Sequence, residues 1–296
     1  MKNIAIMGVV LGTTLGMSSW SFGQAASAPA KTAPAGQTTP AAGQTTPAGQ
    51  AAAPAGKRPP KANSTEEFND YKTAAALTDA AALEKAADDF AKKYPDSELR
   101  TLLYTGAMQR YQQANDADNM LATAKKVLAI DPDDPGALVG AAQTIAEKTR
   151  DTDLDKDEKN AEAKKYAERA LVTVDTDVPT SGYPAEQLAA FKGFLRSEAY
   201  FVLGTLSFNA KNWTDAEANM RKSIDALPQQ PDPIAVFRLA VALDMQNRVP
   251  DALKFANQAV DLTKDRPDSP AGKAARAEQD RLNKLNVGTA PGPAKN

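Results

Sequence analysis

The sharpest chemical signal in the sequence is an acidic stretch, DTDLDKDEKNAE, that begins at Asp151. Its carboxylates have the spacing of a helix-flanked calcium loop, in which positions 1, 3, 5, 7 and 12 supply ligands. Lys156 stands where that loop needs glycine for a sharp turn, and it adds a positive charge. Two interpretations remain open: a calcium loop, or a solvated acidic loop at a helix N-terminus, where the dipole favours carboxylates. The candidate ligands are Asp151, Asp153, Asp155, Asp157 and Glu162.

The chain has no cysteine and no histidine. Disulfides, thiolate catalysis, Cys/His metal centres and all mechanisms that use a histidine base are therefore excluded. Acid–base work by carboxylates alone needs them in a shaped pocket with shifted pKa values. Pairs such as Asp88 and Asp89 instead have the pattern of solvated helix faces, and no glycine-rich phosphate loop is present. We expect no enzymatic activity and no cofactor.

Charge is unevenly distributed along the 296 residues. Residues 1–61 hold five basic side chains and no acid, so the remainder carries 30 basic and 37 acidic side chains, a net −7. A surface that binds a phosphate backbone needs a basic patch. The acidic remainder therefore argues against a nucleic-acid partner.

Residues 1–28 have the three zones of a secretory signal peptide. Lys2 supplies the positive start, Ile4 to Met17 form a short apolar run, and small residues follow. An uncleaved N-terminal anchor is the alternative. We expect an exported protein, periplasmic or secreted, without stable membrane insertion once the signal is removed.

Residues 29–63 form a low-complexity linker rich in Ala, Pro, Gly and Thr, in which GQTTPA occurs twice. Too few apolar residues are present to offset chain entropy, which predicts disorder. The cluster Lys57, Arg58 and Lys61 either touches acidic lipid or polysaccharide, or only keeps the linker soluble.

Helical periodicity starts at Ser64, whose Ser-Thr-Glu-Glu run is a capping-box signature. The pattern continues as about five helix pairs through residues 64–286, with an insertion at 147–160 and a polar last helix from Ser269 to Leu285. Residues 287–296 read as a flexible tail.

The stretch from Ser197 to Pro228 shows the pairing most clearly, as two amphipathic helices joined at Lys211-Asn212. It resembles a tetratricopeptide (TPR) unit, the 34-residue helix-turn-helix repeat. Leu203-Gly204, Ala216 and Pro228 stand at motif positions, while Tyr200 and Met220 replace other motif residues. The residues expected to pack the repeats are Tyr200, Leu203, Gly204, Ala216, Met220, Pro228, Leu239 and Ala252.

The resemblance implies an all-α solenoid whose first helices line a concave groove. The exposed groove positions would be Phe201, Thr205, Phe208 and Asn209 in one repeat, then Phe237, Val241, Asp244 and Met245 in the next. The alternative is that these side chains are core between adjacent units. A capping helix would close the last apolar face of such an array.

The fold alone does not fix a function. The resemblance implies a non-catalytic scaffold of the bacterial cell envelope that holds a protein partner in the groove. The alternative function is a module associated with cell wall or polysaccharide.

Overall fold

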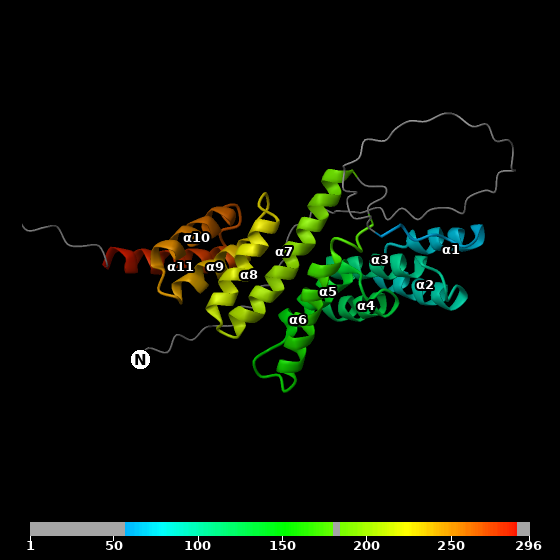
Figure 1. Ribbon diagram of the computed structural model, residues 1–296, viewed down its shortest axis with the longest axis horizontal. Coiled ribbons are helices and arrows are strands. Elements are labelled where there is room, and N and C mark those ends of the chain that lie inside the picture. Colours follow the sequence, from blue (N-terminus) through cyan, green and yellow to red (C-terminus); the bar gives the residue numbers. More distant parts are fainter. Residues whose placement is uncertain (1–56, 180–183, 289–296) are drawn as a thin grey trace, which may run out of the picture. The chain divides into compact units, whose positions relative to one another are not determined.

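A computed structural model describes residues 57–179 and 184–288. These residues form α-helices that follow one another as pairs, so the predicted all-α architecture of helix pairs is confirmed (Figure 1). The predicted signal peptide (1–28), the linker up to residue 56 and the tail from 289 lie outside the described residues. The helices are α1 (Thr65–Ala75), α2 (Ala80–Lys93), α3 (Leu99–Gln113), α4 (Ala117–Ile130), α5 (Pro135–Lys148), α6 (Lys156–Thr173), α7 (Ala185–Asn209), α8 (Trp213–Ala226), α9 (Pro233–Asp244), α10 (Val249–Leu262) and α11 (Pro270–Gly288).

The helices form two compact units rather than one. The N-terminal unit contains the described residues up to Ala137, with α1 to α4, and the segment that starts at Thr173. The C-terminal unit contains Leu138–Val172 and the described residues from Ala185 onward, with α7 to α11. The change of unit falls within α5, so the sequence, which shows α5 as one amphipathic helix, contains no linker signal there.

A polar network joins the helix pairs of the N-terminal unit. Lys126 of α4 contacts two carboxylates of α2, Glu84 at 2.9 Å and Asp88 at 2.8 Å. Tyr104 of α3 donates a hydrogen bond to Asp88, and Tyr111 donates one to Glu84, each at 2.7 Å. Burial and the adjacent carboxylate raise the pKa of Tyr111 to about 12. Both tyrosines therefore stay neutral donors that lock α3 against α2.

Residues 57–63 belong to the folded N-terminal unit and not to the predicted linker. The Lys57 amide donates to the Thr176 carbonyl at 3.0 Å, and the Lys57 ammonium pairs with Asp131. The Arg58 guanidinium and the Lys61 amide both bind Glu98. Lys57 and Arg58 are therefore paired within the protein, with acids that lie far away in the sequence.

The capping box predicted at Ser64 starts α1. The Ser64 hydroxyl accepts from the Glu67 amide at 3.0 Å, while the Glu67 carboxylate reaches back to the Asn63 amide at 2.7 Å. Glu67 is buried, and its carboxylate also accepts from Ser97. The box therefore caps the helix and also ties it to the residues after α2.

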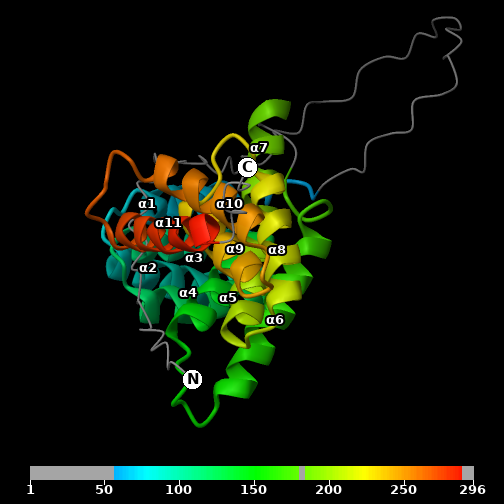
Figure 2. The same cartoon turned by 90° about the vertical axis from the view of Figure 1, so that its left-hand side faces the viewer.

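Alanine fills the helix contacts of the C-terminal unit. The helices α7 to α11 pack in chain order, and α11 covers both α9 and α10 (Figure 2). Alanine side chains at these contacts are almost completely buried, at positions 199, 216, 235, 240, 242, 252, 256, 259 and 275. Small side chains let helix backbones approach closely and cost little side-chain entropy. Leu282 of α11 is fully buried in the same core, so the predicted capping helix closes it.

Three helix pairs share one turn geometry. The residues Asn115, Lys211 and Asn247 have positive φ angles of 56°, 59° and 60°. In each turn the next amide donates to a carbonyl five residues earlier, as in a Schellman ending. The predicted junction at Lys211-Asn212 is one of these turns, and Asn212 caps α8 by accepting from the Asp215 amide.

The loop between α5 and α6 is shorter than predicted. Glu147 and Lys148 complete α5, and α6 already begins at Lys156, so the insertion does not extend over residues 147–160. Asp157 and Glu158 occupy the first turn of α6, where the helix dipole favours acids. Among residues 57–179 and 184–288, no helix has the length and apolar character needed to cross a bilayer.

Gly204 lies against Met220, as expected for the small position of the fourth helix pair. A β-carbon at Gly204 would come within 2.8 Å of the Met220 methyl group and 3.2 Å of its Cγ. We predict that Gly204→Leu lowers the free energy of unfolding by ~1–3 kcal/mol, because it overpacks this contact. Urea unfolding measures the effect. The double variant with Met220→Ala, which empties the space, should recover part of the loss, and no recovery would contradict the packing described.

The N-terminal strap of residues 57–63 gives a second prediction. Glu98→Ala removes the acceptor shared by Arg58 and Lys61 and should release the strap more often. Trypsin should then cleave after Lys61 about 2- to 5-fold faster than in the wild type. The matched control is Asp96→Ala, at an exposed neighbouring acid, which should leave the rate unchanged. Equal rates in both variants would show that the strap is not held by Glu98.

Candidate partner-binding face

The groove positions predicted in α7 gather around one guanidinium, that of Arg238 on α9. Arg238 donates to the Thr205 hydroxyl and lies 5.1 Å from the ring centre of Phe201 and 5.8 Å from that of Phe208. The Thr205 hydroxyl in turn donates to the Phe201 carbonyl at 2.8 Å. Phe201 is only 5% exposed and belongs to the core, whereas Phe208 is half-buried and packs edge-on against Trp213.

The other predicted positions have different surroundings. Phe237 is half-buried and packs against a core cluster that includes Ala259 and Ala275. Asp244 forms an ion pair with Arg281 of α11, so the capping helix occupies that carboxylate. Val241 is half-buried, while Asn209 and Met245 are exposed at the C-terminal ends of α7 and α9.

The predicted repeat-packing residues lie mostly in helix contacts. Ala216, Met220, Leu239 and Ala252 are fully buried. Tyr200 and Leu203 are half-buried, and Lys222 lies over the Tyr200 ring at 5.3 Å. Pro228 is exposed just beyond the end of α8, consistent with a helix stop rather than a packing residue.

Two carboxyl groups act electrostatically on Arg238 without reaching ion-pair distance, those of Asp232 at the N-cap of α9 and Glu147 at the end of α5. The same two carboxyl groups act on Glu198 of α7. Within the described residues, no carboxylate lies within 4.0 Å of the guanidinium, and Glu198 makes no hydrogen bond. We refer to Glu147, Glu198, Thr205, Asp232 and Arg238 as the Arg238 cluster.

Burial without ion pairs shifts the pKa values of the charged groups in the Arg238 cluster. Burial, together with the charges of Asp232 and Glu147, raises the pKa of Glu198 to about 8. Burial also raises the pKa of Asp232 and of Glu147, against the opposing charge of Arg238, and lowers the pKa of Arg238. Glu198, Asp232 and Arg238 nevertheless keep part of their surface open to solvent, and Glu147 is exposed. The groups are therefore accessible while their charges are poorly solvated.

Such an arrangement disfavours the folded state. A charge removed from water needs a close opposite charge to recover its solvation energy. Asp232 accepts from the Ile234 amide, Glu147 accepts from Gln143 and Arg238 donates to Thr205, but none of these partners is an ion. Perturbed titratable groups that remain accessible are typical of functional sites. The cluster can hold or release a proton near neutral pH at Glu198 and can exchange weak internal contacts for those of a bound partner.

Sequence reasoning missed Glu198 and Arg238, although helical spacing contains a signal for one of them. Glu198 precedes Phe201 by three residues and Thr205 by seven, so it shares the face assigned to the groove. Glu147, Glu198 and Arg238 lie on three different helices, α5, α7 and α9. Their mutual influence therefore depends on the tertiary structure and cannot be predicted from local sequence.

The acidic loop at Asp151 is neutralised by its own lysines. Lys156 pairs with Asp151 at 2.9 Å, and Lys159 pairs with Asp155 at 2.9 Å and with Asp153 at 3.3 Å. Asp157 and Glu162 lie on α6. In the described part of the chain, no group of three or more acids is placed to hold a metal ion. Three carboxylates of the loop, those of Asp151, Asp153 and Asp155, are thus paired with lysines of the same segment.

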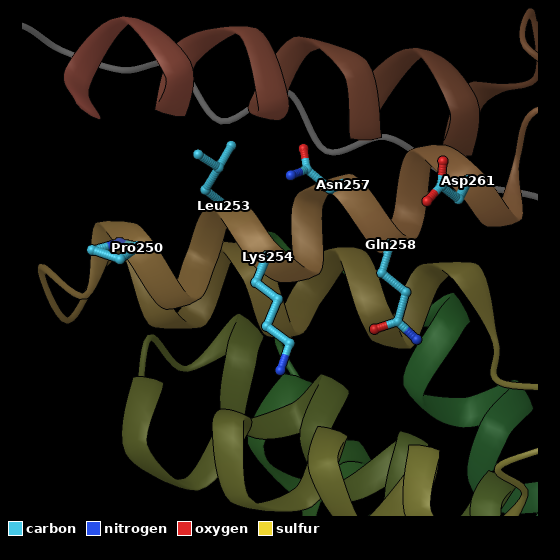
Figure 3. Close-up of a pocket in the computed structure, with 6 residues that line it drawn as sticks. All are labelled: Pro250, Leu253, Lys254, Asn257, Gln258 and Asp261. Atoms are coloured by element: carbon cyan, nitrogen blue, oxygen red, sulfur yellow. The ribbon is translucent and has the colours of Figure 1, made fainter. Parts of the chain in front are cut away.

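A hollow on α10 is the other surface feature (Figure 3). All its lining residues come from this one helix, and Leu253 and Asn257 point to one side while Lys254 and Gln258 point to the other. Asn257 accepts from Gln279 of α11 at 2.8 Å. A surface lined by a single helix cannot enclose a ligand.

No protein-family model matches the chain, and no curated protein matches it. Among solved structures, the chain is similar to the crystal structure of a thermophilic TPR protein of Thermus thermophilus. The identity is 13% and the TM-score 0.43, over 74% of this chain and 100% of that chain.

The raised pKa of Glu198 predicts a pH-dependent stability. Between its ordinary value of 4.5 and about 8, the folded state keeps a proton that the unfolded state releases. The free energy of unfolding should therefore fall as pH rises through this window and level off above it. Glu198→Gln should remove part of this slope, so its advantage over the wild type should grow from pH 5 to pH 8.5.

The measurement is urea unfolding across that pH range. Glu186→Gln, at an exposed acid in the first turn of the same helix, is the matched control and should follow the wild-type curve. Parallel curves for Glu198→Gln and the wild type would mean that Glu198 titrates normally in the folded protein.

Proposed function

We propose that this protein is a non-catalytic scaffold that binds a protein partner on the inner face formed by α7 and α9, at the Arg238 cluster. The observation that carries the proposal is a set of accessible, poorly solvated charges without ion-pair partners, beside the half-buried Phe208. Binding of a partner would supply the contacts that the fold leaves unmade, which compensates for the stability lost in the free protein.

The face also offers both kinds of contact that protein interfaces use. Phe208 and the exposed Met245 provide apolar area, and methionine adapts its shape to different partners. The charged groups provide orientation and specificity more than affinity. Repeat arrays of helix pairs use such surfaces to bind extended segments.

Site-specific crosslinking in the native host tests the binding face. A photoreactive amino acid at Asn209 or Met245 should give a crosslinked partner, because both side chains are exposed next to the proposed face. The same amino acid at Lys254, on the open face of α10, should give none. Equal crosslinking at all three positions, or none at any, would contradict a partner site between α7 and α9.

We further propose that the protein acts after export, on the basis of the predicted signal peptide. N-terminal sequencing of the protein isolated from its host tests this, and a chain that starts close to Ala28 is the expected result. A mature chain that still begins at Met1 would contradict cleavage of the signal.

A further inference from the structure

Lys57, the first residue of the strap at 57–63, joins three parts of the N-terminal unit. Its ammonium pairs with Asp131 at the C-cap of α4 and lies 3.9 Å from the Asp177 carboxylate in the segment after α6. Its amide donates to the Thr176 carbonyl at 3.0 Å. One residue thus fastens the segment after α6 to the end of α4, although the three parts are far apart in the sequence.

The rest of the strap is fastened to two carboxylates. The Arg58 guanidinium binds both oxygens of Glu98, one of them at 2.7 Å, and the Lys61 amide donates to the same carboxylate at 3.1 Å. The Asn63 amide donates to the Glu67 carboxylate at 2.7 Å. All four of these hydrogen bonds end on an acid, so the strap is held mainly by charge.

The strap buries little apolar surface. Ala62 is its one buried residue, Pro59 and Pro60 are half-buried, and the others are exposed. The side chains of Lys57 and Arg58 keep 40% and 60% of their surface open to solvent. A segment with few buried apolar contacts opens locally at a low free-energy cost, and exposed ion pairs are weakened by salt.

The segment after α6 presents a turn to Lys57. The amides of Thr176 and Asp177 both donate to the carbonyl at the end of α6, at 3.1 Å and 2.7 Å, while the Thr176 carbonyl accepts from Lys57. Val174 and Val178 are buried on either side of the turn. Loss of the Lys57 contacts would therefore loosen the turn and leave the two valines packed.

We propose that the strap opens reversibly as the salt concentration rises, without unfolding of the helices, and that its opening releases the turn at Thr176. The strap is separate from the proposed partner-binding face, since its contacts lie within the N-terminal unit. Opening breaks polar contacts at the surface and exposes almost no core. At ~3.4 Å per residue, the open strap adds about 20 Å of reach to the chain that precedes α1.

Hydrogen–deuterium exchange on the full chain, at about 50 mM and about 1 M NaCl, tests the opening. Exchange of the Lys57, Lys61 and Asp177 amides should be about 3- to 10-fold faster at the higher salt, because the exposed ion pairs are screened. Amides in the interior of α2, α3 and α4 should keep their exchange rates, since these helices stay folded.

Two variants separate the ion pairs from a general effect of charge. Lys57→Gln removes the ammonium, so at low salt the Asp177 amide should exchange as fast as it does in the wild type at high salt, with little further response to salt. The matched control is Lys61→Gln, which removes a charge from the same strap. The Lys61 ammonium makes no ion pair within the described part of the chain, so this control should follow the wild type.

Each part of the proposal has an outcome that would overturn it. Exchange of the strap amides that does not depend on salt would overturn the salt-sensitive opening. A strap that opens with salt while the Asp177 amide keeps its exchange rate would overturn the coupling through Lys57. Faster exchange throughout α2, α3 and α4 at the same salt would show that the helices unfold with the strap, and would overturn local opening.

Discussion

The structure depends on the packing of each helix pair against the next one, because a helix pair alone cannot bury all of its apolar surface. Each helix pair leaves one apolar face uncovered, and burial of that face against the next pair provides most of its stability. In the C-terminal unit, many contacts are made by alanines and by Gly204 against Met220, beside fully buried leucines such as Leu239 and Leu243. Small residues bury little area each, so the contacts must be tight and numerous. The capping helix α11, with Leu282 fully buried, ends the series.

This way of packing explains why side chains with charge lie so near the core. Side chains at the contact between α7 and α9 are partly removed from water, as the half-buried Glu198 and Arg238 show. Phe201 is buried in the core, while Arg238 donates to Thr205 and lies over the Phe201 and Phe208 rings. Glu198 remains without a partner among the described residues and holds a proton instead. A sequence under selection for stability alone would replace such groups by apolar ones at little or no cost.

Much of the fold could be predicted from local signals. Three local features depend only on neighbouring residues, and the structure has all of them. They are the capping box at Ser64, the junction at Lys211-Asn212 and the helix stop at Pro228. The start of α6 at Lys156 was missed, because an acidic stretch that resembles a loop is equally suited to the first turn of a helix. The strap at residues 57–63 was missed since its partners, Glu98 and Asp131, are distant in sequence. For the same reason, only the Phe201, Thr205 and Phe208 side of the candidate site was predictable.

The central claim is that the charges at the α7–α9 face are kept for a partner at the expense of stability. The most direct measurement combines unfolding and crosslinking in one double variant, Glu198→Gln with Asp232→Asn. Asparagine preserves the helix cap at residue 232, so only charge is removed. At pH 8.5 the account predicts a higher free energy of unfolding than in the wild type, together with a weaker crosslink from Met245. A variant that is less stable and crosslinks as well as the wild type would contradict it.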